Sequence, residues 1–228
     1  MTDLVRICAM AVAASFAVAL PLRAAQAGGQ VYQYEVEHPS YGDIGTYTNT
    51  VTKDGKAVKV QTALHVVVKM LGIPVFRQDA RRVEQWQDGR LVAFTGATDD
   101  NGKQIDISGQ AQGNHFVIQA PTGTVTAPPQ VHPSNPWAPQ VLDTDMMMST
   151  KTGKVQKVTV TDQGMTNVTF DGRQMRLRQY VVQSDKRQMV WLDARGIVIA
   201  FQTVENGSPI DFVLKNPPPP APQQQASQ

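Results

Sequence analysis

Residues 58–70, VKVQTALHVVVKM, alternate between apolar and polar side chains over almost the whole segment. The apolar positions are Val58, Val60, Leu64, Val66, Val68 and Met70, with Thr62 among them. Lys59, Gln61, His65 and Lys69 occupy positions between them. Because successive side chains of a β-strand point to opposite faces, the segment predicts a strand with one buried and one wet face. Such strands are typical of antiparallel sheets.

Weaker alternation extends through most of the chain and is interrupted by five Asp-Gly or Asn-Gly dipeptides. The weaker segments are 31–37, 45–52, 114–120, 154–161, 166–170, 176–182 and 210–214. The dipeptides lie at 54–55, 88–89, 101–102, 171–172 and 206–207. Both dipeptides tolerate positive φ angles and favour the two-residue turns of β-hairpins. We therefore expect an all-β fold, a strongly curved, half-barrel-like antiparallel meander of roughly ten to twelve strands.

Residues 138–153, APQVLDTDMMMSTKTG, are the best helical candidate. They follow a Pro-rich stretch, and Leu142 and Met146 would share one helical face, backed by Val141 and Met148. We expect one short helix, around residues 139–149, that covers part of the sheet.

A Trp-x-Asp motif occurs at residues 86–88 and again at 191–193, which raises the question of a paired active site. The match continues at one offset, so that residues 86–106 are echoed at 191–211. The aspartates stand in turn sequences, where a short carboxylate bonds to nearby backbone. We therefore interpret the motif as a structural device, produced either by duplication or by convergence of two halves. The expected anchors are Trp86, Asp88, Gly89, Trp191, Asp193 and Gly196.

Residues 1–27 are typical of a Sec-type signal peptide. Arg6 precedes an apolar run, and Ala25-Gln26-Ala27 matches the small-x-small cleavage pattern. A membrane anchor is the alternative, but the run of about 16 residues is shorter than the roughly 20 that span a bilayer. Cys8 is the only cysteine, so cleavage after Ala27 leaves none. We expect a periplasmic or secreted protein without disulfides.

Residues 28–216 are long enough for a single β domain. Without Arg6 and Arg23 the chain has 19 Lys and Arg, and without Asp3 it has 18 Asp and Glu. This near-neutral chain has no basic stripe, so we expect no nucleic-acid partner and, after cleavage, no transmembrane segment. Residues 217–228, rich in Pro and Gln, are expected to form a disordered tail, either a solvated end or a partner-binding segment.

The sequence lacks the motifs of common enzyme classes. It has no Gly-x-Ser-x-Gly elbow, phosphate loop or dinucleotide fingerprint, so we expect neither a cofactor nor a catalytic motif. The four histidines show no metal-ligand spacing, and no metal is expected. Asp106 and Asp211 are the only repeated carboxylates outside turns, and they are the candidates for acid–base chemistry.

Several ordered motifs resemble an uncharacterised secreted family of proteobacteria, known as the domain of unknown function numbered 6134. The motifs are YGDIGTYTNTV, EQWQDGRLVAF, APTGTVTAP, PSNPW, VWLDARGIVIAF and ENGSPIDF. The resemblance runs from about Tyr34 to Leu214 and implies no activity and no catalytic residues.

VWLDARG and LDTDMMMST also resemble, more loosely, a second uncharacterised periplasmic family. That resemblance implies a large curved antiparallel sheet similar to the half-barrels of lipoprotein carriers. A curved sheet with an apolar face can leave a groove for an acyl chain.

Our leading hypothesis is a non-enzymatic periplasmic protein that binds an apolar or lipid-like ligand, or an envelope partner, in the concave face of its sheet. The expected lining is Val66, Val68, Phe116, Trp137, Leu142, Met146 and Met148. One alternative is an envelope hydrolase that uses Asp106 and Asp211 with a histidine. Another is a structural or assembly factor of the envelope, tethered by its Pro-rich tail.

Overall fold

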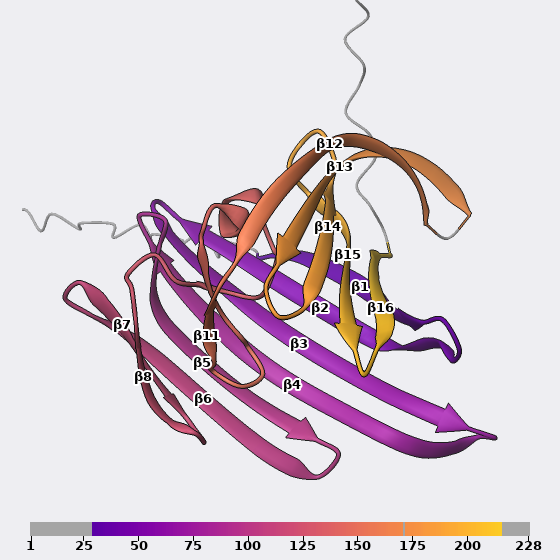
Figure 1. Cartoon of the computed structure of the whole chain (residues 1–228), viewed down its shortest axis with the longest axis horizontal. Coiled ribbons are helices and arrows are strands. Elements are labelled where there is room, and N and C mark those ends of the chain that lie inside the picture. The colour runs from indigo at the N-terminus through magenta and orange to yellow at the C-terminus, as the bar shows by residue number, and fades with distance from the viewer. Residues whose placement is uncertain (1–28, 171, 216–228) are drawn as a thin grey trace, which may run out of the picture.

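The computed structural model describes residues 29–170 and 172–215. The expected signal peptide, the expected tail and Asp171 lie outside the described residues. Within them, nearly all regular structure is β-strand (Figure 1). Thirteen strands form one large sheet, and three more form a small second sheet.

The large sheet contains two groups of strands that are consecutive in sequence. The first group is β1 (Gln30–His38), β2 (Gly42–Asp54), β3 (Ala57–Met70), β4 (Ile73–Gln87), β5 (Arg90–Asp100), β6 (Lys103–Gln112), β7 (His115–Ala120) and β8 (Gly123–Ala127). The second is β12 (Thr159–Phe170), β13 (Arg173–Gln183), β14 (Arg187–Leu192), β15 (Val198–Glu205) and β16 (Ser208–Leu214). The 128–158 segment between them holds β9 (His132–Pro133), the 3₁₀ turn η1 (Pro139–Leu142), β10 (Met146–Met148) and β11 (Val155–Lys157).

The large sheet consists of two antiparallel meanders joined side by side. Its hydrogen-bonded order is β12-β13-β14-β15-β16-β1-β2-β3-β4-β5-β6-β7-β8. The meanders meet where β1 pairs with β16, from Tyr34 opposite Leu214 to Glu37 opposite Asp211. The predicted all-β antiparallel fold is confirmed, with more strands than expected.

The predicted half-barrel-like curvature needs correction, because the sheet is open and not strongly curled. Its edge strands, β8 and β12, lie at opposite ends of the strand order and do not pair. The change of direction is local. Tyr47 of β2 and Phe201 of β15 would be about 14 Å apart in a flat sheet, but their ring centroids are 5.4 Å apart. The sheet therefore bends at β16 and β1 (Figure 1). We call the side that carries these rings the inner face.

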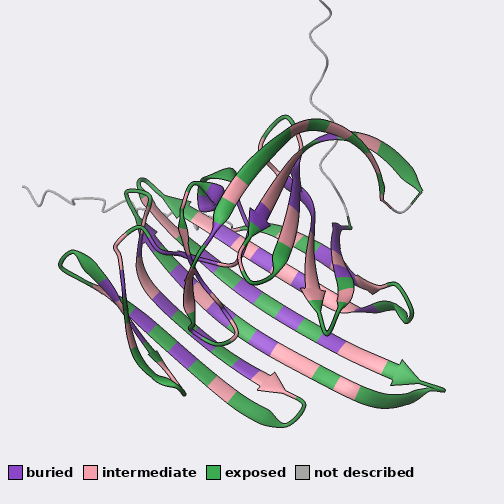
Figure 2. Ribbon diagram, viewed as in Figure 1, coloured by how far each residue is buried: buried purple, intermediate pink, exposed green. Residues whose placement is uncertain are grey.

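Burial alternates along the long strands, as the banded colouring of β3 to β6 shows in Figure 2. On β3, Val60, Thr62, Leu64 and Val66 are buried and the residues between them are exposed. The strand predicted at 58–70 is thus confirmed as β3. Its buried face is the inner face, since Leu64 lies opposite Tyr47 of β2.

Two hydrophobic clusters form the core. One packs β1 to β3 against β14 to β16 around the rings of Tyr34, Tyr47 and Phe201. The other packs β4 to β7 against the 128–158 segment around Trp86 and Phe116. The connection between the two meanders therefore covers the inner face of the first one.

The helix predicted around residues 139–149 is wrong. In this segment the chain forms one 3₁₀ turn, η1, which ends at Leu142 with Asp143 as its C-cap. Thr144 Oγ1 then accepts a hydrogen bond from the backbone N–H of Met146, at 3.1 Å. Met146 to Met148 continue as strand β10 between β9 and β11. The Thr144 hydroxyl competes with helix formation by bonding to nearby backbone, and the apolar spacing alone did not reveal this.

Trp86 and Trp191 occupy similar places in the sheet. Each lies near the end of a strand that enters a hairpin, and each borders a register shift in that hairpin. Asp88 adopts φ +52° beside Gly89 in the β4–β5 turn. The residues of the first motif therefore build a turn, as expected.

The second motif builds a longer turn. Asp193 Oδ1 accepts hydrogen bonds from the backbone N–H groups of Arg195 and Ile197, both at 2.9 Å. Gly196 has φ +77°, and a Cβ added there would lie 2.8 Å from Pro139 Cγ of η1. The aspartates thus act on the backbone, while an origin by duplication stays a prediction.

One hairpin turn departs from the others. Leu71 in the β3–β4 turn has φ +52°, in the left-handed region that Asp88, Asn101 and Asn206 occupy in three other turns. Leu71 is 97% exposed, so no packing offsets this strain. We predict that Leu71→Asn raises the free energy of unfolding by about 1 kcal/mol, measured by chemical denaturation. Asn101→Leu is the reverse change and should lower it by a similar amount; no effect from either would contradict the argument.

Candidate functional site

A groove of about 790 Å³ lies on the inner face, where the two meanders face each other. We call it the inner groove. Its apolar lining comes from β1 to β4 on one side and from β15 and β16 on the other: Val36, Ile44, Leu64, Val66, Val68, Phe76, Phe201, Ile210 and Phe212. Ligand sites in proteins are usually concave, mostly apolar and roughly 300–1,000 Å³ in volume. The inner groove is therefore the candidate site.

The register of β3 and β4 orders the floor of the inner groove. Val68 lies opposite Phe76, and six residues further along β4, Arg82 lies opposite Thr62. Six residues of strand span about 20 Å. The floor therefore runs from an apolar end at Phe76 to a polar end at Arg82.

Arg82 lies at the polar end and is only 7% exposed. Its Nε–H donates a hydrogen bond to the backbone oxygen of Thr150, at 3.2 Å. Burial lowers the pKa of its guanidinium, while Tyr47 and Glu84 act in the opposite direction. Because the ordinary pKa of arginine is so high, the side chain keeps its positive charge.

Glu84 is fully buried two residues further along β4. Its Oε2 accepts hydrogen bonds from the indole N–H groups of Trp86, at 2.9 Å, and Trp137, at 3.0 Å. Its Oε1 accepts one from Asn135 Nδ2, at 2.8 Å. Burial raises the pKa of Glu84 to about 7, although these three bonds lower it. The carboxylate thus titrates near neutral pH inside the protein.

Asn135 extends this network to the neighbouring strands. Its Oδ1 accepts hydrogen bonds from Tyr47 Oη, at 2.7 Å, and Asn49 Nδ2, at 3.2 Å. Thr62 Oγ1 in turn donates to Asn49 Oδ1, at 2.7 Å. The network, which we call the polar cluster, ties the 128–158 segment to β2, β3 and β4. It closes the floor of the inner groove beyond Arg82.

The other end of the inner groove lies near the tips of the β1–β2 and β3–β4 hairpins. Tyr41 and Val75 line it there and are exposed, and the His38 ring packs against Tyr41 with centroids 4.6 Å apart. Met70 and Ile73 are also exposed on the β3–β4 hairpin. The mouth of the inner groove therefore has an apolar rim.

The structure places the residues predicted to line a ligand site in different parts of the molecule. Val66 and Val68 line the inner groove. The others pack elsewhere: Phe116, Trp137 and Met148 in the cluster around Trp86, Leu142 in the cluster around Tyr34, and Met146 half-buried in β10. They do so because the 128–158 segment lies against the sheet and fills the space that the prediction assigned to a ligand.

Sequence reasoning missed Arg82 and Glu84. A signal was present, because Ala80, Arg82, Glu84 and Trp86 alternate and share one face of β4. Two charged residues at the alternate positions of a strand that face the core require partners inside the protein. That pattern marks the polar end of the inner groove.

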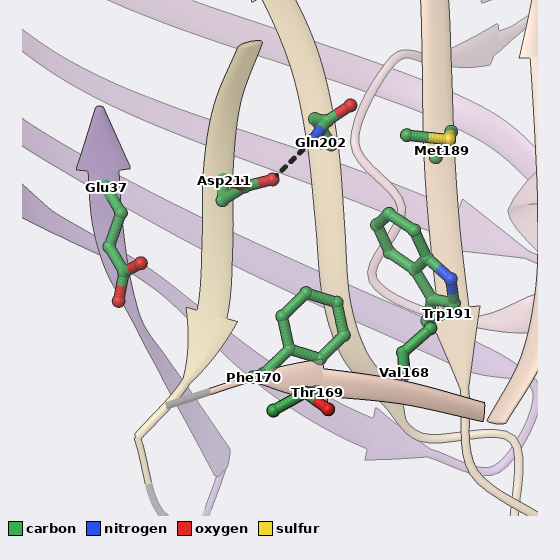
Figure 3. A pocket seen from close by; sticks show the side chains of 8 residues that line it. All are labelled: Glu37, Val168, Thr169, Phe170, Met189, Trp191, Gln202 and Asp211. Carbon is green, nitrogen blue, oxygen red and sulfur yellow. Dashed lines mark hydrogen bonds between the residues drawn. The ribbon is translucent and has the colours of Figure 1, made fainter. Parts of the chain in front are cut away.

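Asp106 and Asp211 do not converge. They lie on β6 and β16, with five strands between them in the sheet. Asp211 instead faces Glu37 in the β1–β16 register, in an open pocket of about 370 Å³ on the outer face (Figure 3). The Asp211 carboxylate points at Gln202, whose Nε2 donates to it at 2.7 Å. No histidine lines this pocket, so the expected acid–base set is not assembled there.

The described residues show no group of three or more His, Cys, Asp or Glu that could hold a metal ion. Over the same part of the chain, no helix has the length and apolar character needed to cross a membrane.

The sequence profile of a family described as a domain of unknown function, DUF6134, matches residues 34–215. The chain belongs to the DUF6134 family. This confirms the resemblance drawn from the ordered motifs. No curated protein shows significant similarity to the chain.

Among solved structures, the chain is similar to a beta-barrel-like protein of the domain of unknown function DUF1849 from Brucella abortus. The TM-score is 0.59 at 12% sequence identity, over 82% of this chain and 96% of that one. At this identity the likeness concerns the fold alone.

The titration of Glu84 predicts a pH dependence of stability. Because its pKa in the folded protein is about 7, above the ordinary value of 4.5, the folded state binds the proton more tightly than the unfolded chain. The contribution of this proton to the free energy of unfolding is complete below about pH 4.5. It is lost as pH rises through about 7, which lowers the free energy of unfolding by about 3 kcal/mol.

Denaturation of wild type and Glu84→Gln between pH 4 and pH 8 tests this prediction. The stability of wild type relative to the variant should fall across this range, because Gln cannot titrate. His132, whose pKa burial lowers, titrates in both proteins and cancels in the comparison. Parallel pH curves would refute a buried, titrating Glu84.

The two anchor tryptophans predict unequal responses to the same change. Trp86 and Trp191 are both buried, but only the Trp86 indole N–H has an acceptor, whereas Trp191 Nε1 has none. Trp86→Phe should therefore cost about 1–3 kcal/mol more than Trp191→Phe in denaturant unfolding. Trp86→Ala should cost about 3–5 kcal/mol. Equal losses from the two Phe variants would show that the Glu84 bond is unimportant.

Proposed function

We propose that this protein binds an apolar, lipid-like ligand in the inner groove and acts as a non-enzymatic component of the bacterial periplasm. The observation that carries the proposal is the set of apolar side chains that both meanders contribute to the lining of a cavity of about 790 Å³, beside polar residues such as Gln78, Thr203 and Ser208. The signal-like sequence at residues 1–27 supports the location.

The dimensions of the inner groove support a single acyl chain as the occupant. From Phe76 to Arg82 the floor is about 20 Å long. The hydrocarbon core of a bilayer is about 30 Å thick, so one acyl chain spans about 15 Å of it. One chain therefore fits along the floor, with its free end near the apolar rim at Tyr41 and Val75.

The hydrolase alternative has less support. Five strands lie between Asp106 and Asp211 in the sheet, and Asp211 lies on the outer face with Glu37. The assembly-factor alternative depends on residues 217–228, which lie outside the described part of the chain.

Two adjacent valines of β3 offer a matched test. Val68 lines the inner groove, whereas Val67 lies opposite Arg77 on the other face of the sheet, and both are half-buried. Val68→Trp should fill the groove and weaken binding of the uncharged dye N-phenyl-1-naphthylamine about tenfold, a change of about 1.4 kcal/mol. Val67→Trp should leave the affinity within about twofold. Fluorescence titration of the three proteins measures both effects.

Wild-type protein that fails to bind the dye saturably would overturn the proposed function. So would an equal loss of affinity in the Val67→Trp control. Native mass spectrometry of protein purified from the periplasm gives an independent readout, with a co-purifying lipid as the expected result.

A further inference from the structure

We propose that Arg82 receives the carboxylate head of a single-chain amphiphile whose acyl chain fills the inner groove. This inference rests on the proposed function and names the class of ligand. It predicts that a fatty-acid anion enters head first and lies with its chain directed toward the rim at Tyr41 and Val75.

The hydrogen bonding of Arg82 leaves most of its donors available. A guanidinium has five N–H donors in a fixed planar fork. One of them, on Nε, bonds to Thr150 O. No described residue accepts a hydrogen bond from either Nη atom of Arg82. The two Nη groups therefore have capacity for a carboxylate, which a guanidinium binds with two parallel bonds.

The Nη groups border the inner groove rather than solid core. Among the described residues, the fully buried side-chain nitrogens without a partner are Arg90 Nε and Trp191 Nε1, and neither belongs to Arg82. Arg82 is itself part of the groove lining. A ligand at the polar end of the groove can thus reach these donors.

No described carboxylate forms an ion pair with Arg82, although Glu84 raises its pKa electrostatically. Glu84 forms no ion pair with it, and both Glu84 oxygens are occupied by Trp86, Trp137 and Asn135. Asp100, which also lines the groove, pairs with Lys151 at 2.9 Å and accepts a bond from Gln78 at 3.1 Å. A buried charge without a partner is costly, and an opposite charge with good geometry offsets that cost.

The charge balance at this end favours a head with one negative charge. Lys151 is the other cation in the groove lining, and Asp100 already neutralises it. Arg82 is then the remaining Lys or Arg of the lining, and it has no ion-pair partner among the described residues. A carboxylate matches the charge of Arg82, whereas a phosphate monoester carries closer to two negative charges at neutral pH.

Ligands that share one chain length and differ in head group separate the contribution of the head group to the affinity from that of the chain. Dodecanoate, dodecanol and dodecyl phosphate are titrated against full-length processed protein loaded with N-phenyl-1-naphthylamine, at pH 7. Wild type should bind dodecanoate about tenfold more tightly than dodecanol, and more tightly than dodecyl phosphate. Equal affinity for acid and alcohol, or tighter binding of the phosphate, would overturn the carboxylate assignment and leave the proposed function standing. Failure of all three to displace the dye would overturn both.

Variants then assign the preference to one residue. Arg82→Met keeps the length of the side chain and removes its charge, and it should reduce the affinity for dodecanoate about tenfold while dodecanol binding stays within about twofold. Arg81→Met is the matched control, because Arg81 is the exposed neighbour of Arg82 on the other face of β4 and lies outside the groove lining, and the preference for the acid should survive.

Arg82→Lys provides a second test if Arg82→Met does not fold. Lysine keeps the charge but lacks the planar fork, so the preference for dodecanoate over dodecanol should shrink without disappearing. An undiminished preference in either Arg82 variant, or its loss in Arg81→Met, would contradict the assignment to Arg82.

Discussion

The hydrogen bonds to the buried Glu84 carboxylate hold the most irregular part of the chain in place. Two indole N–H groups and one amide reach it from β4 and from the 128–158 segment. A buried carboxylate costs several kcal/mol unless its oxygens are satisfied. The observed placement of the 128–158 segment supplies Trp137 and Asn135 together. The interaction therefore specifies where this segment lies, beyond what apolar packing alone would require.

The position of the 128–158 segment decides where the molecule is filled and where it is hollow. On one side of the polar cluster, Trp137 and Met148 complete the core over β4 to β7. On the other side the inner groove begins at Arg82, and β15 and β16 lie across it from β3 and β4. Two charged residues, two positions apart on one strand, thus have separate roles. Glu84 is satisfied within the protein, and Arg82 borders open space.

Much of the sheet could be predicted from short-range patterns. Alternation at 58–70 identified β3, and the Asp-Gly and Asn-Gly dipeptides placed several hairpin turns, because both signals depend on neighbouring residues only. Long-range facts were not accessible in this way. Nothing local to Met146 indicates that it pairs with Lys157, and nothing local to Phe116 or Trp137 separates a core position from a groove lining. The prediction of the site failed for the same reason. The position of Arg82 at the end of the groove follows only from its register opposite Thr62, which the sequence does not show.

The pairing of β1 with β16 has a consequence for how the chain folds. These are the first and last strands of the described part, yet they are neighbours in the interior of the sheet. Each meander consists of hairpin contacts close in sequence, which form quickly, whereas this seam must close a loop of nearly the whole domain. Until it closes, β1 and β16 are both exposed edges, in addition to β8 and β12. A partly folded molecule therefore offers twice as many edges for wrong pairing with another copy as the native one, and the seam is where a folding helper would act most usefully.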